Sequence, residues 1–157
     1  QGEILTTPLQ LANSMAVIAN EGFYITPHLN KHDSMLTKVH KAKVDKKYFP
    51  IVNEGMWRVF EYGTGRHYKI PNTSMCGKTG TVQNNHGKDH SLFVGFAPRE
   101  KPKIAIAVVV ENAGFGATWA APISSLMMEQ YLYGKIERTD LLERMTTSVT
   151  NANVKER

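Results

Sequence analysis

Two apolar runs joined by a short turn place the strongest constraint on the fold of this chain. The first run occupies residues 91–97 and the second residues 103–111, and the turn between them contains Pro98 and Pro102. A connection this short predicts an antiparallel hairpin. Because the second run is apolar on both faces, we expect helices to cover both sides of the sheet. Its two faces carry Ile104, Ile106, Val108 and Val110 on one side and Ala105, Ala107 and Val109 on the other.

A third strand is predicted over residues 74–82, and it carries the candidate functional residues. Successive side chains of a strand point to opposite faces, so Lys78 and Gly80 should share one face and the two threonines the other. An ammonium group and the hydroxyls of Thr79 and Thr81, placed along an exposed sheet margin, are suited to bind a carboxylate. Gly80 has no Cβ, so a ligand backbone can lie close to it. On an edge strand, the unpaired backbone groups can bind an extended peptide.

The lysine-threonine-glycine tripeptide at residues 78–80 has two competing interpretations. By itself it can be an ordinary strand end. It can also be the end of a nucleotide-binding P-loop, because Gly77 precedes the lysine and threonine. That motif needs a further glycine where this chain has Asn72, and a helix where residues 82–87 are turn-like. The P-loop interpretation therefore fails.

Three helices are predicted from caps and from apolar residues at helical spacing. Thr7 and Gln10 form a capping box, which begins a helix that stops at Gly22. A second helix is expected over residues 50–62 and a third over residues 119–133. We expect one face of the third helix to pack in the core. That face carries Ile123, Leu126, Met127, Gln130 and Tyr131.

Two segments are predicted to lack regular structure. Residues 30–49 are polar and lysine-rich and are interpreted as a surface excursion, and residues 145–157 as a disordered tail. The 157 residues fit a single domain, with a formal charge of +5. The basic residues are spread out except at residues 40–47, where no aromatic residues are interleaved. A solvated face is therefore favoured, and no nucleic-acid partner is expected.

Cysteine and histidine give no strong sign of a catalytic or metal site. The single Cys76 excludes an internal disulfide and is interpreted as a small buried hydrophobic residue rather than a nucleophile. His86 and His90 are four residues apart, but Gly87 argues against a helix that would place both on one face. We therefore expect no metal site. His90 is interpreted as a loop residue at the border of a substrate groove.

Several segments, taken together, resemble the class B penicillin-binding transpeptidases. Gln1 and Gly2 followed by residues 7–12 resemble the family's Q-G-x…T-P-L-Q-L-A helix, and residues 76–81 resemble its x-G-K-T-G-T strand. The hairpin, with F-A-P before its turn and V-V-V-E-N after it, resembles the last two strands. The spacing and the E-N-x-G-x-G end are closest to the cell-elongation type, penicillin-binding protein 2. The resemblance extends over about residues 1–134.

The resemblance implies that residues 1–157 are the C-terminal part of a transpeptidase domain. Of the signatures Ser-x-x-Lys, Ser-Asp-Asn and Lys-Thr-Gly, only the last is present, since none of the seven serines starts either of the others. The serine nucleophile is thus expected in the N-terminal half of the domain, outside this chain, and the chain alone is expected to be inactive. The implied fold is α+β, a partial β-lactamase/transpeptidase-like fold with three antiparallel strands flanked by helices.

The resemblance also assigns roles along residues 78–81. Lys78 would lend positive charge and contact the Ser-Asp-Asn motif of the other half. Thr79 and Thr81, beside Gly80, would bind the terminal carboxylate of a D-Ala-D-Ala stem peptide or of a β-lactam. The Thr81 N–H would form half of an oxyanion hole. The implied parent is a serine D,D-transpeptidase without a cofactor, at the extracytoplasmic (periplasmic) face of the bacterial inner membrane, with its anchor outside this chain.

The sequence leaves two alternative functions open and also suggests a homodimer. A serine β-lactamase or a β-lactam sensor would share the strand motif. A non-catalytic module would use the same strand only to hold a peptide carboxylate. Without the family's remaining strands, the strand at residues 103–111 would have an open apolar edge, so a homodimer is a further hypothesis.

Overall fold

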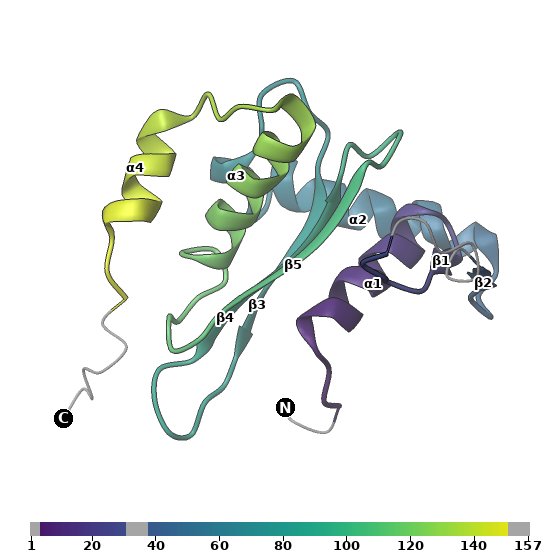
Figure 1. Cartoon of the computed structure of the whole chain (residues 1–157), viewed down its shortest axis with the longest axis horizontal. Coiled ribbons are helices and arrows are strands. Elements are labelled where there is room, and N and C mark those ends of the chain that lie inside the picture. Colours follow the sequence, from purple (N-terminus) through teal and green to yellow (C-terminus); the bar gives the residue numbers. More distant parts are fainter. Residues whose placement is uncertain (1–3, 31–37, 151–157) are drawn as a thin grey trace.

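The computed structural model describes residues 4–30 and 38–150 and has an α+β fold. Its main sheet contains three antiparallel strands, β3 (Cys76–Val82), β4 (His90–Ala97) and β5 (Ile104–Val110). Their order is β3-β4-β5, so β3 and β5 form the two edges (Figure 1). The predicted hairpin and the predicted third strand are both confirmed.

Helices cover both faces of this sheet, as expected. α1 (Pro8–Ala19) packs on one face of β4 and β5, and α3 (Ala120–Tyr133) packs on the opposite face (Figure 1). Alternation along β4 divides the core, because Phe96 packs on the α1 side and Phe93 on the α3 side. Both rings are fully buried, and each stabilises the fold by about 1.5–3 kcal/mol.

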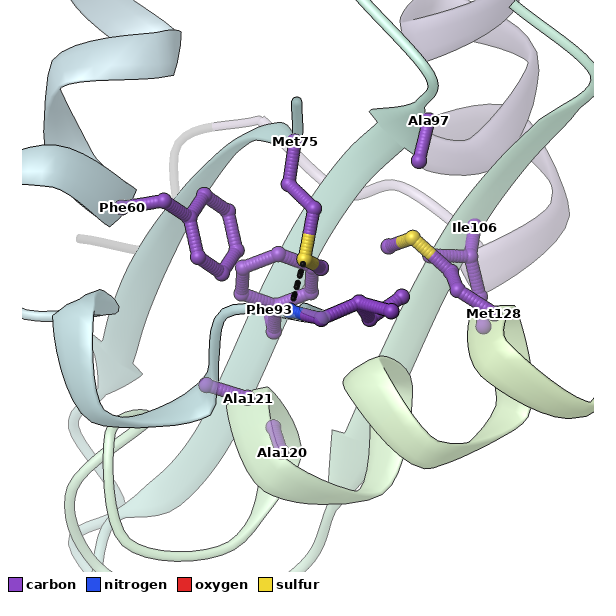
Figure 2. Packing of buried hydrophobic residues seen from close by; sticks show 9 residues of the cluster. Phe60, Met75, Phe93, Ala97, Ile106, Ala120, Ala121 and Met128 are labelled. Carbon is purple, nitrogen blue, oxygen red and sulfur yellow. Dashed lines mark hydrogen bonds between the residues drawn. The ribbon is translucent and has the colours of Figure 1, made fainter. Parts of the chain in front are cut away.

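The larger cluster of buried residues lies between α3 and the sheet. Figure 2 shows the Phe60 and Phe93 rings at its centre, and their centroids are 5.8 Å apart in an edge-to-face arrangement. This arrangement is favourable for aromatic rings beyond the area that they bury. The cluster comprises Phe60, Ile70, Met75, Phe93, Ala97, Ile106, Ala120, Ala121 and Met128. The smaller cluster, on the α1 side, comprises Met15, Met56, Cys76 and Phe96.

The helix α2 (Phe49–Glu61) packs against the edge strand β3. It contributes Phe60 to one cluster and Met56 to the other, so it joins the two halves of the core. The short helix η3 (Arg66–Tyr68) then leads the chain back toward β3. The edge strand that carries the candidate residues is therefore held by β4 and by α2.

The predicted helix ends are confirmed at α1 and α3. The Thr7 Oγ1 atom accepts a hydrogen bond from the Gln10 N–H at 3.2 Å, and the Gln10 side chain accepts one from the Thr7 N–H at 2.8 Å. Gly22 follows α1 with a φ of 110°, and Gly134 ends α3 with a φ of 71°. Glycine adopts these conformations without steric cost, which explains why α3 stops at Gly134 and how the chain turns at Gly22 after α1 has ended at Ala19.

Residues 30–49 contain more regular structure than predicted. The strand β2 (Val39–Lys41) pairs antiparallel with β1 (Phe23–Ile25), and the short helix η2 (Lys46–Tyr48) leads into α2. Residues 31–37 lie outside the described residues. The two strands stabilise each other by pairing, which the composition of either segment alone does not reveal.

The predicted disordered tail is wrong over residues 145–147. These residues form the end of α4 (Thr139–Thr147), whereas residues 151–157 lie outside the described residues. No helix within residues 4–30 and 38–150 is long and apolar enough to cross a membrane.

The predicted core face of α3 is also wrong in part. Met127 and Tyr131 are 52% and 63% exposed, whereas Ser124, Ser125 and Glu129 are buried. Burial of these polar groups is possible because they are hydrogen-bonded: the Ser124 hydroxyl, for example, donates to the Ala120 carbonyl at 2.7 Å. The apolar pattern therefore placed Leu126 correctly in the core but missed the polar residues that are buried beside it.

Candidate functional site

The candidate residues lie on an accessible edge of the main sheet. Among the described residues, β3 pairs only with β4. Lys78 is exposed, and Thr79, Gly80 and Thr81 are partly buried. They lie neither in the middle of a sheet nor in a helix, as the sequence interpretation requires.

The side chains of β3 alternate between the two faces. Cys76 belongs to the α1-side cluster, and Lys78 points to the same face, opposite Val94, which packs against that cluster. Thr79 lies opposite Phe93 of the α3-side cluster. The ammonium group and the hydroxyl therefore leave the strand on opposite faces, and a ligand can contact both only along the open edge.

The backbone of β3 presents both an acceptor and a donor at that edge. The Lys78 ammonium group donates to the Thr79 carbonyl oxygen at 2.8 Å, which places this carbonyl on the side away from β4. In an antiparallel strand, the N–H and C=O of one residue point the same way, and the direction reverses at each residue. The Thr81 N–H therefore faces the open edge as well.

A hydroxyl from outside the strand extends the site. The Thr64 Oγ1 atom lies 2.9 Å from the Thr79 Oγ1 atom. Thr64 follows α2, in a loop held by the hydrogen bond from the Gly65 N–H to the Val59 carbonyl at 3.0 Å. Thr64 was not predicted from the sequence. Its only local signal is a hydroxyl between two glycines, and its partner lies fifteen residues further along the chain.

The chain's own residues pack closely around Gly80. A Cβ atom at Gly80 would lie 3.2 Å from the Leu92 side chain. A Cβ atom at Gly116 would lie only 2.3 Å from the Gly80 carbonyl oxygen. The open edge of β3 is thus the side from which a ligand backbone can approach.

Cys76 is a core residue, as predicted. It is fully buried, and its thiol donates to the Asn53 carbonyl at 3.5 Å. Burial raises the pKa of the Cys76 thiol to about 12. The thiol therefore stays protonated at neutral pH and is not a nucleophile.

Ser91 is the serine nearest to the site in the strand register, since it lies opposite Thr81. It is fully buried. Its hydroxyl donates to the Phe115 carbonyl at 2.9 Å and accepts from the Ala120 N–H at 3.0 Å. These bonds attach the loop before α3 to β4, so the hydroxyl has a structural use rather than a nucleophilic one.

The prediction that His90 lies in a loop is wrong. His90 is the first residue of β4 and pairs with Val82, and its Nδ1 atom accepts a hydrogen bond from the Asn112 N–H at 3.0 Å. It is thus attached to the end of β5 rather than placed beside Lys78. In the part of the chain that the structure describes, no three histidine, cysteine, aspartate or glutamate side chains are grouped to hold a metal ion.

The arrangement is suited to bind an extended peptide that ends in a carboxylate. The ammonium group of Lys78 and the hydrogen-bonded hydroxyl pair of Thr64 and Thr79 offer donors for a carboxylate. Hydrogen bonds to a charged group are about twice as strong as neutral ones. The open edge accepts a peptide backbone by strand addition. The Thr81 N–H can donate to an oxygen on which negative charge develops.

Comparisons with known proteins agree on one family. The sequence matches the penicillin binding protein transpeptidase domain over residues 1–129. The peptidoglycan D,D-transpeptidase MrdA of Acinetobacter baumannii is 36% identical over a match that covers 84% of this chain and 23% of that protein.

Solved structures of similar fold come from the same family. The crystal structure of penicillin-binding protein 2 from Pseudomonas aeruginosa has a TM-score of 0.74 and 36% identity, and the match covers 88% of this chain and 33% of that one. The imipenem acyl-enzyme of penicillin-binding protein A from Mycobacterium tuberculosis has a TM-score of 0.73 and 28% identity, over 84% of this chain and 32% of that one. The chain therefore spans about a quarter to a third of the length of these relatives.

Proposed function

Because the chain belongs to the transpeptidase domain family of penicillin-binding proteins, we propose that it supplies the substrate-binding strand of a peptidoglycan D,D-transpeptidase. The observation that carries the proposal is the open edge of β3, where a lysine ammonium group, a pair of threonine hydroxyls and a backbone N–H are all accessible from one side. The likeness to penicillin-binding protein 2 supports the cell-elongation type.

This geometry determines how the substrate binds along β3. The terminal carboxylate of a D-Ala-D-Ala stem peptide binds beside Lys78 and the Thr64–Thr79 hydroxyl pair. Its backbone lies along the edge past Gly80, and the carbonyl to be attacked points at the Thr81 N–H. A donor in an oxyanion hole contributes about 3 kcal/mol of transition-state stabilisation. The second donor and the attacking serine come from the rest of the parent domain.

The reaction is acyl transfer in two steps. The serine oxygen attacks the carbonyl carbon of the penultimate D-alanine and gives its proton to a base in the rest of the domain. The C–N bond breaks, and D-alanine leaves with a proton on its nitrogen. An amine of a neighbouring stem peptide then attacks the ester, which releases the serine and forms the cross-link. A β-lactam has a carboxylate and a reactive carbonyl, so it binds at the same site and acylates the same serine.

The partners of the chain follow from this role. They are the stem peptide, β-lactams and the remaining half of the same transpeptidase domain. Cross-linking takes place where peptidoglycan is assembled, so we place the parent protein at the extracytoplasmic face of the bacterial inner membrane. The formal charge of +5 suits an anionic cell-wall polymer.

The test uses the full-length protein that carries this sequence and a fluorescent penicillin. Lys78→Ala is expected to lower the acylation rate by about 10²-fold, because a charged group that acts on the substrate is lost. The control is Lys135→Ala, an exposed lysine paired with Glu137 at 2.7 Å. Equal labelling of Lys78→Ala and the unmodified protein would contradict the proposal. Rapid turnover of the penicillin would indicate a β-lactamase instead.

The chain by itself provides a second test. Because it lacks the serine motifs, we expect no covalent labelling of residues 1–157 alone by the same penicillin. Rapid stoichiometric labelling of this chain would refute the assignment of roles.

A further inference from the structure

The loop between β5 and α3, residues 111–119, lies directly against the strand that carries the site. A Cβ atom at Gly116 would lie 2.3 Å from the Gly80 oxygen, 2.8 Å from the Gly80 nitrogen and 2.4 Å from the Leu92 oxygen. All three are backbone atoms of paired strands, so they cannot move aside as a flexible side chain can. The loop therefore approaches β3 as closely as only glycine allows.

This contact falls on the peptide group that carries the proposed oxyanion donor. The Gly80 carbonyl and the Thr81 N–H belong to one planar trans peptide unit, and they point in opposite directions. Gly116 touches the carbonyl end of that unit, and the N–H end faces the open edge. A displacement of the Gly80 oxygen must therefore move or rotate the Thr81 N–H.

The end of the loop that leads into α3 is held by several hydrogen bonds. Its Phe115 carbonyl accepts from the Ser91 hydroxyl at 2.9 Å, and the same hydroxyl accepts from the Ala120 N–H at 3.0 Å. The Ala121 N–H donates to the Gly116 carbonyl at 2.9 Å. Ser91 is fully buried and pairs with Thr81 across the β3–β4 ladder. These bonds therefore attach the loop to β4 directly opposite the residue whose N–H is the proposed oxyanion donor.

The other end of the loop is attached to the connection between β3 and β4. The Asn84 side-chain amide donates to the Asn112 Oδ1 atom at 2.6 Å. The Gly114 N–H donates to the Asp89 carbonyl at 2.7 Å. With both ends attached, the loop cannot swing away from β3 without breaking several hydrogen bonds.

We propose that Gly116 and Ser91 are positioning residues. They fix the position of the Thr81 N–H from the side of β3 opposite its open edge. The proposal rests on the proposed acyl-transfer function. Neither residue touches the substrate. They act on the rate of the acylation step, because the oxyanion donor is used there, and not on the initial binding of the carboxylate at Lys78 and Thr79.

The experiment measures acylation by a fluorescent penicillin under pre-steady-state conditions, in the full-length protein with Gly116→Ala. The added Cβ atom forces the loop and the Gly80–Thr81 peptide apart by several tenths of an ångström. A misplacement of about 1 Å can lower a rate by about 10²-fold. We expect a fall of about that size in the acylation rate constant, with an unchanged dissociation constant for the complex that precedes acylation.

The matched control is Gly55→Ala on α2, where an added Cβ atom would meet no atom within 4 Å. It should acylate as the unmodified protein does. A merely structural role for Gly116 would lower the fraction of protein that reacts and leave its rate constant unchanged. The infrared carbonyl band of the acyl-enzyme gives an independent signature, since a weakened oxyanion hole moves this band to higher wavenumber.

Ser91→Ala is the second variant, and it loosens the loop without adding atoms. It should lower the same rate constant by a smaller factor. The inference is overturned if Gly116→Ala acylates at the rate of Gly55→Ala with an unshifted carbonyl band, or, should Gly116→Ala not fold, if Ser91→Ala acylates at the unmodified rate. An unmodified protein that is not acylated at all would instead refute the proposed function.

Discussion

At the scale of single residues, the Thr64–Thr79 hydroxyl pair is the part of the site that the strand motif does not contain. The two oxygens are 2.9 Å apart, and they come from different segments. One hydroxyl donates its proton to the other, and the second keeps its own proton for a ligand, so the pair offers one donor to that ligand. Thr64 thereby restricts the rotamer of Thr79 before a carboxylate arrives, which lowers the entropy cost of binding.

We predict that Thr64→Val weakens the binding of penicillin before acylation, by about fivefold, which corresponds to one net hydrogen bond of about 1 kcal/mol. A double-mutant cycle with Thr79→Val in the full-length protein measures the coupling. The control is Thr147→Val on α4, on the far side of α3 from the sheet (Figure 1). Strictly additive effects of Thr64→Val and Thr79→Val would show that the two hydroxyls act independently.

At the scale of elements, a buried ion pair holds the segment between α3 and α4. The Arg138 guanidinium donates to the Glu129 carboxylate at 2.9 Å, with only 16% and 3% of the two side chains exposed. It also donates to the Tyr68 carbonyl at 3.0 Å and to the Ser125 hydroxyl at 2.8 Å. The guanidinium thus connects α3, α4 and η3, and it satisfies the polar atoms on the buried face of α3.

Arg138→Met is predicted to destabilise the chain by about 3–5 kcal/mol, because it leaves the Glu129 carboxylate buried without its partner. The free energy of unfolding in urea measures this loss. Lys135→Ala is the matched control, since Lys135 and Glu137 form a pair at 2.7 Å with 69% and 66% of the side chains exposed. The exposed pair should contribute little. Similar losses for both variants would contradict this difference between the two ion pairs.

At the scale of the whole molecule, the sheet has two edges of different character. The edge at β3 is partly polar and carries the proposed site, and α2 packs against this strand. The edge at β5 is apolar, and no further strand pairs with it in the described residues. Long apolar edges favour pairing with another chain.

The isolated chain is therefore predicted to form a reversible dimer through β5. Sedimentation velocity over a wide range of protein concentrations measures the association. Val109→Lys, at a residue of β5 that is 39% exposed, should weaken it by placing a charge at the edge. The control is Val82→Lys on β3, where the valine is 38% exposed. A monomer at every concentration, or dissociation by Val82→Lys alone, would count against pairing through β5.

Much of the fold and part of the site could be predicted because their signals are local. The capping box at Thr7 and Gln10 spans three residues, and the short turn after β4 leaves only an antiparallel hairpin for the apolar runs. Alternation along β3 divides Lys78 from Thr79 whatever the strand packs against. The β1–β2 pairing and α4 were missed, because contacts with other segments stabilise them.

The sequence by itself determined the three strands of the main sheet, the helices α1, α2 and α3, and the residues along β3, since neighbouring residues restrict one another's backbone. Only the tertiary structure decided that Thr64 meets Thr79, that Gly116 touches Gly80 and that Glu129 is buried with Arg138. The physical reason is that a polar group can be buried, or a backbone approached closely, only when a distant segment supplies the partner or the space.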